Sequence, residues 1–171
     1  MKMALNGIEE FVGEYLKIIE KCDFINYNTN FKINDDECNK QNGMAEVDII
    51  GINTKEKKIF VCEVSAQING IGAYADRVNK KFEKSKKYVE ANLKEFGAKA
   101  EDIKYLFWCP FITDGEKQKI TDQDVIIISK KEFLQAIDKL KDYLKDQTPV
   151  YFSPVTRFLQ VYAHLEKKYR K

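Results

Sequence analysis

Hydrophobic positions recur every three to four residues along 7–21 and again along 73–96, which predicts two amphipathic helices. Between them, 23–33 and 45–53 are rich in β-branched and aromatic residues, and 58–67 has the same character. These three segments predict strands. Only a short charged turn separates the last two, which therefore predict a β-hairpin.

The second half of the chain alternates between strand and helix patterns. Residues 103–112 form an almost continuous apolar run, which is typical of a strand buried on both faces, and 124–129 repeats that pattern. Residues 114–124 predict a short helix or a loop. Helical patterns then cover 130–146 and about 154–170.

Two local signals sharpen these last helices. Ser129 followed by Glu132 is a helix-start pattern and predicts that a helix begins after Ser129. In the last helix we expect an apolar stripe to face the core, and it is formed by Val155, Phe158, Leu159 and Tyr162.

The order of elements predicts the fold class. Antiparallel strands come first and strand–helix alternation follows, which favours an α/β fold with one mixed sheet and helices on both faces. Neither an internal repeat nor a linker divides the sequence, so we expect one domain over 1–171 that includes the C-terminal helix.

Composition narrows the class of protein. The chain is 44% hydrophobic and 33% charged, with a net charge of +2, as is usual for soluble proteins. It contains no apolar run of the ~18 residues that a membrane span requires, and acidic residues appear too early for a secretory leader. We therefore expect no membrane partner and a cytoplasmic location. The cysteines are scattered without a CxxC pair, which favours reduced thiols over a zinc site: Cys22, Cys38, Cys62 and Cys109.

Positive charge is concentrated in one predicted helix. The stretch from Arg77 to Lys87 contains six basic residues and one acid, a net charge of +5 that leaves the rest of the chain slightly acidic. Such a helix can be an anion-binding face, for example for nucleic acid. The alternative is an ordinary solvated helix surface.

Two acidic residues lie at positions of the predicted hairpin that look half-buried. Asp48 (in VDII) and Glu63 (in VCEV) come side by side when the hairpin closes, and strand alternation puts Ser65 and Gln67 on the face of Glu63. Adjacent carboxylates repel unless a cation or a shared proton compensates them. Oxygen ligands suit Mg²⁺ or Mn²⁺, and such a metal assists attack of water on a phosphodiester. The alternative is that each acid pairs with a lysine at a strand end.

The motif Asp48, followed fifteen residues later by Glu63-Val64-Ser65, resembles the core of the PD-(D/E)xK nuclease superfamily. AEVDIIGI and IFVCEV are similar to archaeal Holliday-junction resolvases and Mrr-type restriction domains. The resemblance implies a restriction-endonuclease-like fold and a Mg²⁺-dependent endonuclease acting on DNA. It also implies that the Asp48 and Glu63 carboxylates and the Val64 carbonyl bind the metal.

The family often adds an acid from the first helix. The resemblance favours Glu9 for that role, because its spacing to Val12 and Leu16 resembles that of the resolvase helix; Glu14 is second and Glu10 third. The alternative for Glu9 is a favourable acid in the first turn of a helix.

Ser65 stands where the family motif has lysine, and this departure leaves three interpretations open. Ser65 and Gln67 can position the attacking water, although serine brings no positive charge. Lys81, on the following helix, can instead supply the charge. Alternatively the site is degenerate, and the domain binds nucleic acid or a protein partner without cutting it. If it cuts both strands of a duplex, two active sites are needed, so a homodimer is one expectation.

Overall fold

The computed structural model describes residues 7–32, 44–68, 72–92, 99–147 and 153–169. In chain order its elements are α1 (Gly7–Ile18), β1 (Phe24–Lys32), β2 (Met44–Asn53), β3 (Lys58–Val64), α2 (Ala75–Asn92), β4 (Ile103–Trp108), α3 (Asp114–Lys117), β5 (Val125–Ile128), α4 (Lys130–Leu144) and α5 (Pro154–Tyr169). Short 3₁₀ turns at Gly72–Tyr74 and Ala100–Asp102 precede α2 and β4. The predicted order of helices and strands is confirmed.

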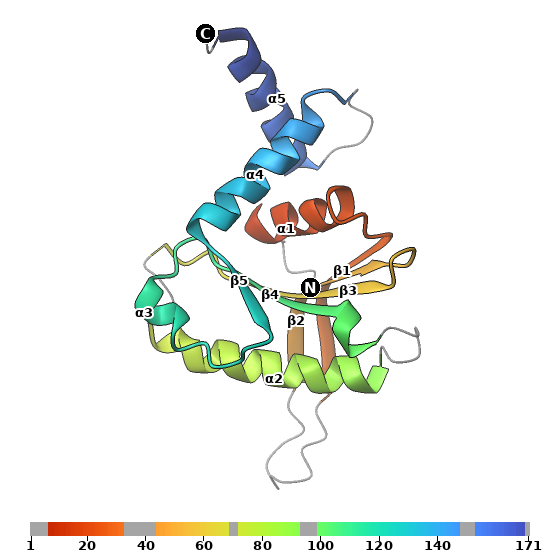
Figure 1. Ribbon diagram of the computed structural model, residues 1–171, viewed down its shortest axis with the longest axis vertical. Coiled ribbons are helices and arrows are strands. Elements are labelled where there is room, and N and C mark those ends of the chain that lie inside the picture. The colour runs from red at the N-terminus through yellow and green to blue at the C-terminus, as the bar shows by residue number, and fades with distance from the viewer. Residues whose placement is uncertain (1–6, 33–43, 69–71, 93–98, 148–152, 170–171) are drawn as a thin grey trace, which may run out of the picture.

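The strands form one mixed sheet in the order β1-β2-β3-β4-β5. β1, β2 and β3 pair antiparallel as a meander, whereas β4 pairs parallel to β3 and β5 parallel to β4. Figure 1 shows α2 along one face of this sheet and α1 on the other, with α4 and α5 beyond α1. The fold is therefore α/β, with helices on both faces of a five-stranded sheet.

Side-chain alternation along the strands divides the core into two layers. The layer under α2 includes Ile50, Val61, Phe82, Val89, Tyr105 and Phe107. The layer under α1, α4 and α5 includes Leu16, Phe60, Cys62, Trp108, Phe133 and Leu140. β4 contributes to both layers, so it is the strand buried on both faces that its apolar run predicts. β3, predicted only as half of the hairpin, contributes to both layers as well.

The helix that faces the first layer agrees with its sequence pattern. Five residues of α2 are buried against the sheet: Ala75, Val78, Phe82, Ser85 and Val89. They recur at helical spacing, so one stripe of α2 covers the sheet while its basic residues stay at the flanks and on the outside.

The predicted apolar stripe of the last helix was right at Val155 and Leu159 and wrong at Phe158 and Tyr162. Leu159 is buried and Val155 half-buried, but Phe158 is 70% and Tyr162 43% exposed. The face that packs inward is instead formed by Thr156, Leu159, Gln160 and Ala163. The buried Gln160 amide donates to the backbone carbonyls of Leu144 and Gln147. The inward face of α5 is thus hydrogen-bonded to the end of α4. Apolar residues lie on several sides of α5, and hydrophobicity alone could not choose among them.

Several element ends also differ from the predictions. β3 ends at Val64, and β4 ends at Trp108, where the chain turns away. β5 is only partly buried, with Ile126 49% exposed, and it is an edge strand of the sheet that the described residues form. α4 begins after Ser129 as predicted, although the Ser129 hydroxyl donates to the Glu132 carboxylate rather than accepting a backbone N–H.

Two composition-based expectations can be compared with the described residues. None of the helices found there has the length and apolar character needed to cross a membrane. Cys22, Cys62 and Cys109 are buried free thiols, and Cys38 lies outside the described residues.

Candidate functional site

The β2–β3 hairpin brings the two motif carboxylates together. Ile49 pairs with Cys62, so the next position along the ladder sets Asp48 opposite Glu63. The Val64 N–H donates a 2.8 Å hydrogen bond to Asp48 Oδ2, which holds that carboxylate across the strand ends. Asp48 is 7% and Glu63 2% exposed, so both are more buried than the sequence suggested.

Lys81 from α2 binds both carboxylates. Its Nζ lies 2.9 Å from Asp48 Oδ1 and 2.5 Å from Glu63 Oε2. The Ser85 hydroxyl donates to the Lys81 carbonyl at 2.8 Å and lies 3.5 Å from Glu63 Oε1. We call Asp48, Glu63 and Lys81 the carboxylate–lysine cluster. The Lys81 side chain is 31% exposed, so the cluster reaches solvent on the lysine side.

The charged groups of the cluster shift one another's pKa values. Burial raises the pKa of Glu63 well above its usual value, and the nearby Asp48 carboxylate raises it further, while Lys81 opposes both. Burial lowers the pKa of Lys81, but the two carboxylates outweigh burial and hold that pKa above its usual value. Lys81 is therefore an ammonium at neutral pH. Because the Asp48 carboxylate raises the pKa of Glu63, a further cation beside the two acids would relieve the same repulsion.

Ser65 and Gln67 lie apart from this cluster. Ser65 is buried beyond the end of β3, where its N–H donates to the Trp108 carbonyl at 2.9 Å and its side chain hydrogen-bonds Cys109. Gln67 is exposed. Across the described residues, no hydrogen bond joins either side chain to the cluster. Of the residues considered as replacements for the motif lysine, Lys81 contacts the two acids, whereas Ser65 and Gln67 do not.

The acids of the first helix lie near Tyr27. Burial raises the pKa of the Tyr27 phenol to about 12, and Glu14, Glu10 and Glu9 add to that rise. α1 also covers the face of the sheet opposite to α2 (Figure 1). The charges that act on Glu63 are Asp48 and Lys81. The assignment of Glu9 to the site stays a prediction.

Part of the positive charge on α2 is neutralised within the chain. Lys86 Nζ lies 2.7 Å from a carboxylate oxygen of Asp122 and 2.7 Å from one of Asp124, both in the segment before β5. Lys87 pairs with Glu83 one turn earlier on the same helix at 3.2 Å. These two lysines therefore contribute less to an anion-binding face than the sequence suggested.

The remaining basic residues include a stripe next to the cluster. Arg77, Lys81 and Lys84 follow one another at i, i+4 and i+7, so they share one flank of α2. The Arg77 guanidinium lies over the Tyr74 ring, 5.3 Å from its centroid. This flank carries positive charge on both sides of Lys81.

The donor set of the cluster fits a small hard cation. Asp48 Oδ1 and Glu63 Oε2 converge on one atom, the Lys81 Nζ, and carboxylate oxygens are ligands that Mg²⁺ prefers. Among the described residues there is no group of three or more His, Cys, Asp or Glu side chains that could hold a metal ion. Magnesium commonly uses only one or two carboxylates and completes its shell with water and phosphate, so two carboxylates are sufficient.

One member of the site was missed from the sequence. Ser85 lies on the buried stripe of α2, and its hydroxyl is close to the Glu63 carboxylate. A serine among apolar stripe positions was the available signal, because a buried hydroxyl requires a hydrogen-bond partner.

Comparisons with known proteins do not identify the chain. No protein-family model matches it, and neither the curated proteins nor the solved structures gave a significant match.

Proposed function

We propose that this protein is a Mg²⁺- or Mn²⁺-dependent endonuclease of restriction-endonuclease-like fold that hydrolyses DNA phosphodiester bonds. The observation that carries the proposal is the convergence of Asp48, Glu63 and Lys81 on one solvent-accessible point. Two buried carboxylates at the end of a hairpin, with a lysine from the next helix, match the chemistry that the sequence motif implies.

Each residue of the cluster has a distinct role in this proposal. Asp48 and Glu63 hold the metal, and the Val64 N–H orients Asp48 by donating to its second oxygen. When bound, the metal supplies polarisation of the attacking water and of a phosphoryl oxygen. Lys81 supplies the positive charge that Ser65 lacks and stabilises the negative charge that develops on the phosphate.

The ammonium and the metal cannot share one position. Metal binding would therefore require Lys81 to move toward solvent, and its side chain is 31% exposed. The flank of α2 that carries Lys81 also carries Arg77 and Lys84, and these basic side chains would contact the phosphates of a nucleic acid.

A cleavage assay tests the proposal. Supercoiled plasmid, linear duplex, single strands and a four-way junction are incubated with Mg²⁺, Mn²⁺ or EDTA. We expect metal-dependent cutting that falls by at least ~10²-fold in Glu63→Gln and in Lys81→Met. Glu56→Gln and Lys145→Met are matched controls in exposed ion pairs, and both should cut like the wild type. Undiminished cutting by Glu63→Gln would contradict the proposal.

A second function is a binding module without catalysis. It is favoured by Ser65 at the motif lysine position and by Lys81 already neutralising one of the two acids. The two functions differ in their metal dependence. A binding module would bind DNA equally well in EDTA, would show no rise in melting temperature with Mg²⁺, and would leave every substrate uncut.

A further inference from the structure

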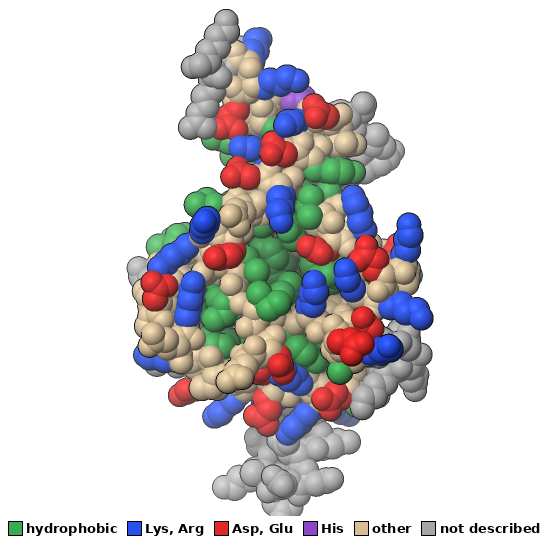
Figure 2. Space-filling model, viewed as in Figure 1, with side chains coloured by type: hydrophobic (Ala, Val, Ile, Leu, Met, Phe, Trp, Pro, Cys, Tyr) green, Lys and Arg blue, Asp and Glu red, His purple; other side chains and the backbone are tan. Residues whose placement is uncertain are grey.

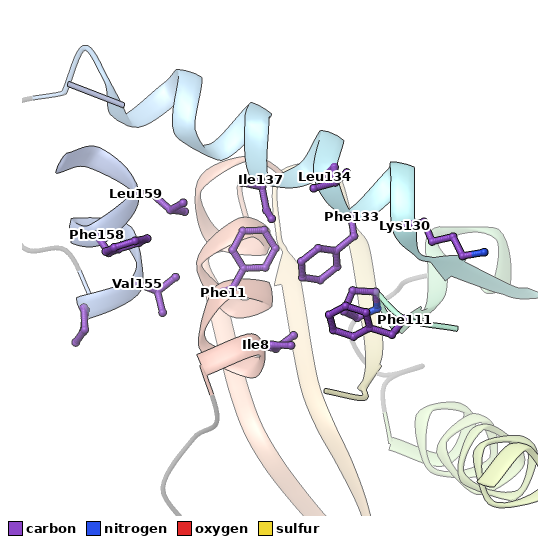
Figure 3. Close-up of a pocket in the computed structure, with 12 residues that line it drawn as sticks. Ile8, Phe11, Phe111, Lys130, Phe133, Leu134, Ile137, Val155, Phe158 and Leu159 are labelled. Atoms are coloured by element: carbon purple, nitrogen blue, oxygen red, sulfur yellow. The ribbon is translucent and has the colours of Figure 1, made fainter. Parts of the chain in front are cut away.

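An apolar pocket of about 640 Å³ lies on the face of the sheet opposite to the carboxylate–lysine cluster. It is bounded by α1, the segment after β4, α4 and the first turns of α5 (Figure 3). Figure 2 shows hydrophobic side chains gathered in the region between α4 and the sheet, with charged side chains around them. A volume of this size is typical of small-molecule sites, which span roughly 300–1,000 Å³.

The walls of the pocket are almost entirely hydrocarbon. Phe11 and Phe133 are buried beneath it, in ring contact at 5.2 Å between centroids. Three large hydrophobic lining residues remain exposed to solvent: Phe111 is 45%, Leu134 62% and Phe158 70% exposed. Large apolar side chains left exposed around a concave surface mark a binding site.

The charged residue of the lining is Lys130. Figure 3 shows it at one end of the pocket, with its nitrogen directed away from the other lining residues, and Val155 and Phe158 at the other end. Its ammonium pairs with the exposed Asp114 at 3.6 Å, near the outer limit of an ion pair, and such exposed pairs exchange easily. An exposed lysine side chain can rotate, so Lys130 can turn toward the pocket and pair with a ligand carboxylate in place of Asp114.

The backbone at Lys130 is also unusual. Its φ of 37° lies in the left-handed region, which costs a residue with a side chain on the order of 1 kcal/mol or more. The Lys130 N–H donates to the Pro110 carbonyl at 3.2 Å, so a tertiary hydrogen bond holds this conformation. The start of α4 is thereby attached to the segment that carries Phe111.

These features exclude most kinds of occupant. A nucleotide, a sugar or an extended peptide would bury polar groups against walls that offer them no hydrogen bonds. A hydrocarbon chain with one negative end avoids this cost, because only its carboxylate needs a polar partner.

We propose that this pocket binds a free long-chain fatty acid. Its alkyl chain lies between α1, α4 and α5, and its carboxylate binds the Lys130 ammonium. The pocket is separated from the carboxylate–lysine cluster by the sheet, so this site does not depend on the proposed nuclease activity.

The protein contains its own reporter for this site. Trp108 is its single tryptophan, and the indole packs edge-on against two residues that line the pocket. The ring centroids are 6.3 Å from that of Phe11 and 5.9 Å from that of Phe133. A brominated alkyl chain in the pocket would therefore lie near the indole and quench its fluorescence.

The test is a titration of the full chain with dibrominated stearic acid, below the concentration at which the acid forms micelles. We expect saturable quenching of Trp108 by the wild type, weakened at least about tenfold in Leu134→Arg, which places a charge in the pocket. Phe158→Ser, at another exposed lining position, is a second variant and should weaken it too. Leu165→Arg is the matched control, since Leu165 is 51% exposed on α5 outside the pocket, and it should bind like the wild type.

A second arm tests the carboxylate. The methyl ester should bind the wild type about five- to tenfold more weakly than the acid, and Lys130→Ala should remove that difference. Absence of saturable quenching, or equal weakening by Leu134→Arg and Leu165→Arg, would overturn the proposal. So would light scattering that shows a wild-type dimer dissociated by Leu134→Arg, because a second copy would then fill the pocket.

Discussion

The two faces of one sheet differ sharply in chemistry. Neighbouring residues of β3 point in opposite directions, so Glu63 faces α2 and lies within a cluster of charges, while Cys62 faces α1 and lies among apolar side chains. The charged cluster is held by hydrogen bonds from the Val64 N–H and the Lys81 ammonium to the two carboxylates at the strand ends. The opposite face is held by aromatic and aliphatic packing and ends in an open pocket.

This difference teaches what each kind of site demands from the fold. Buried carboxylates require partners at fixed positions, and here Lys81 and the Val64 N–H meet that requirement. An apolar pocket requires only shape and the absence of polar groups. Substitutions in the charged cluster should therefore change the stability of the fold, whereas substitutions on the rim of the pocket should change ligand binding with little effect on stability.

The largest effect should come from the packing that holds α2 over the cluster. Phe82 is fully buried and contacts the rings of Tyr105 and Phe107 edge-on, at 6.5 and 6.3 Å between centroids. Phe82→Ala should lower the free energy of unfolding by about 3–5 kcal/mol in urea titrations. Leu134→Ala, on the rim of the pocket, should change it by less than about 0.5 kcal/mol. Equal costs would mean that Leu134 is buried in solution.

Removing the lysine of the cluster should come next. Lys81→Met leaves two buried carboxylates without a cation, which should cost about 2–3 kcal/mol once the partial exposure of Lys81 is taken into account. The double variant Glu63→Met/Lys81→Met should recover most of that loss, because the remaining Asp48 still accepts the Val64 N–H. Lys145→Met, in an exposed ion pair, is the control and should be nearly neutral. A double variant less stable than Lys81→Met alone would contradict this account.

A smaller effect is expected on the opposite face, at Gly13. Its position in α1 lies directly against the Tyr27 ring, and an added methyl group would overlap the phenol. Gly13→Ala should therefore destabilise the protein by about 1–3 kcal/mol, although alanine is the better helix former. Gly7→Ala, at the start of the same helix, meets open space and should not destabilise it. Thermal melts of the two variants compare them directly.

The smallest effect concerns pH. Tyr27 has its pKa raised to about 12 by burial and by the acids of α1, whereas the unfolded chain loses that proton near its usual value of about 10. The folded state therefore keeps the proton longer, and this residue's contribution to stability falls as pH rises from about 10 to about 12. The decline should be on the order of 1 kcal/mol steeper in the wild type than in Tyr27→Phe. The free energy of unfolding of both proteins is measured by urea titration at pH 9 and at pH 11.5. An equal fall between the two pH values in wild type and Tyr27→Phe would show that the phenol is not buried.

Much of the fold was predictable because it depends on local periodicity. The strand order along the chain, the hairpin and the inward stripe of α2 all follow from which positions are apolar. The hairpin also predicted that Asp48 and Glu63 lie side by side, because a short turn and strand alternation leave few registers.

The rest depended on how distant segments pack. Asp48 and Glu63 required a cation, and the sequence allowed lysines at strand ends or on the next helix. The packing of α2 against the sheet placed Lys81 beside both acids. α5 presents apolar residues on several sides, and hydrogen bonds from Gln160 to the end of α4 accompany the choice of buried face. That choice left Phe158 exposed at the pocket. The sequence by itself thus determined the elements and the paired acids, whereas long-range contacts, which no local pattern encodes, decided their partners and the open apolar face.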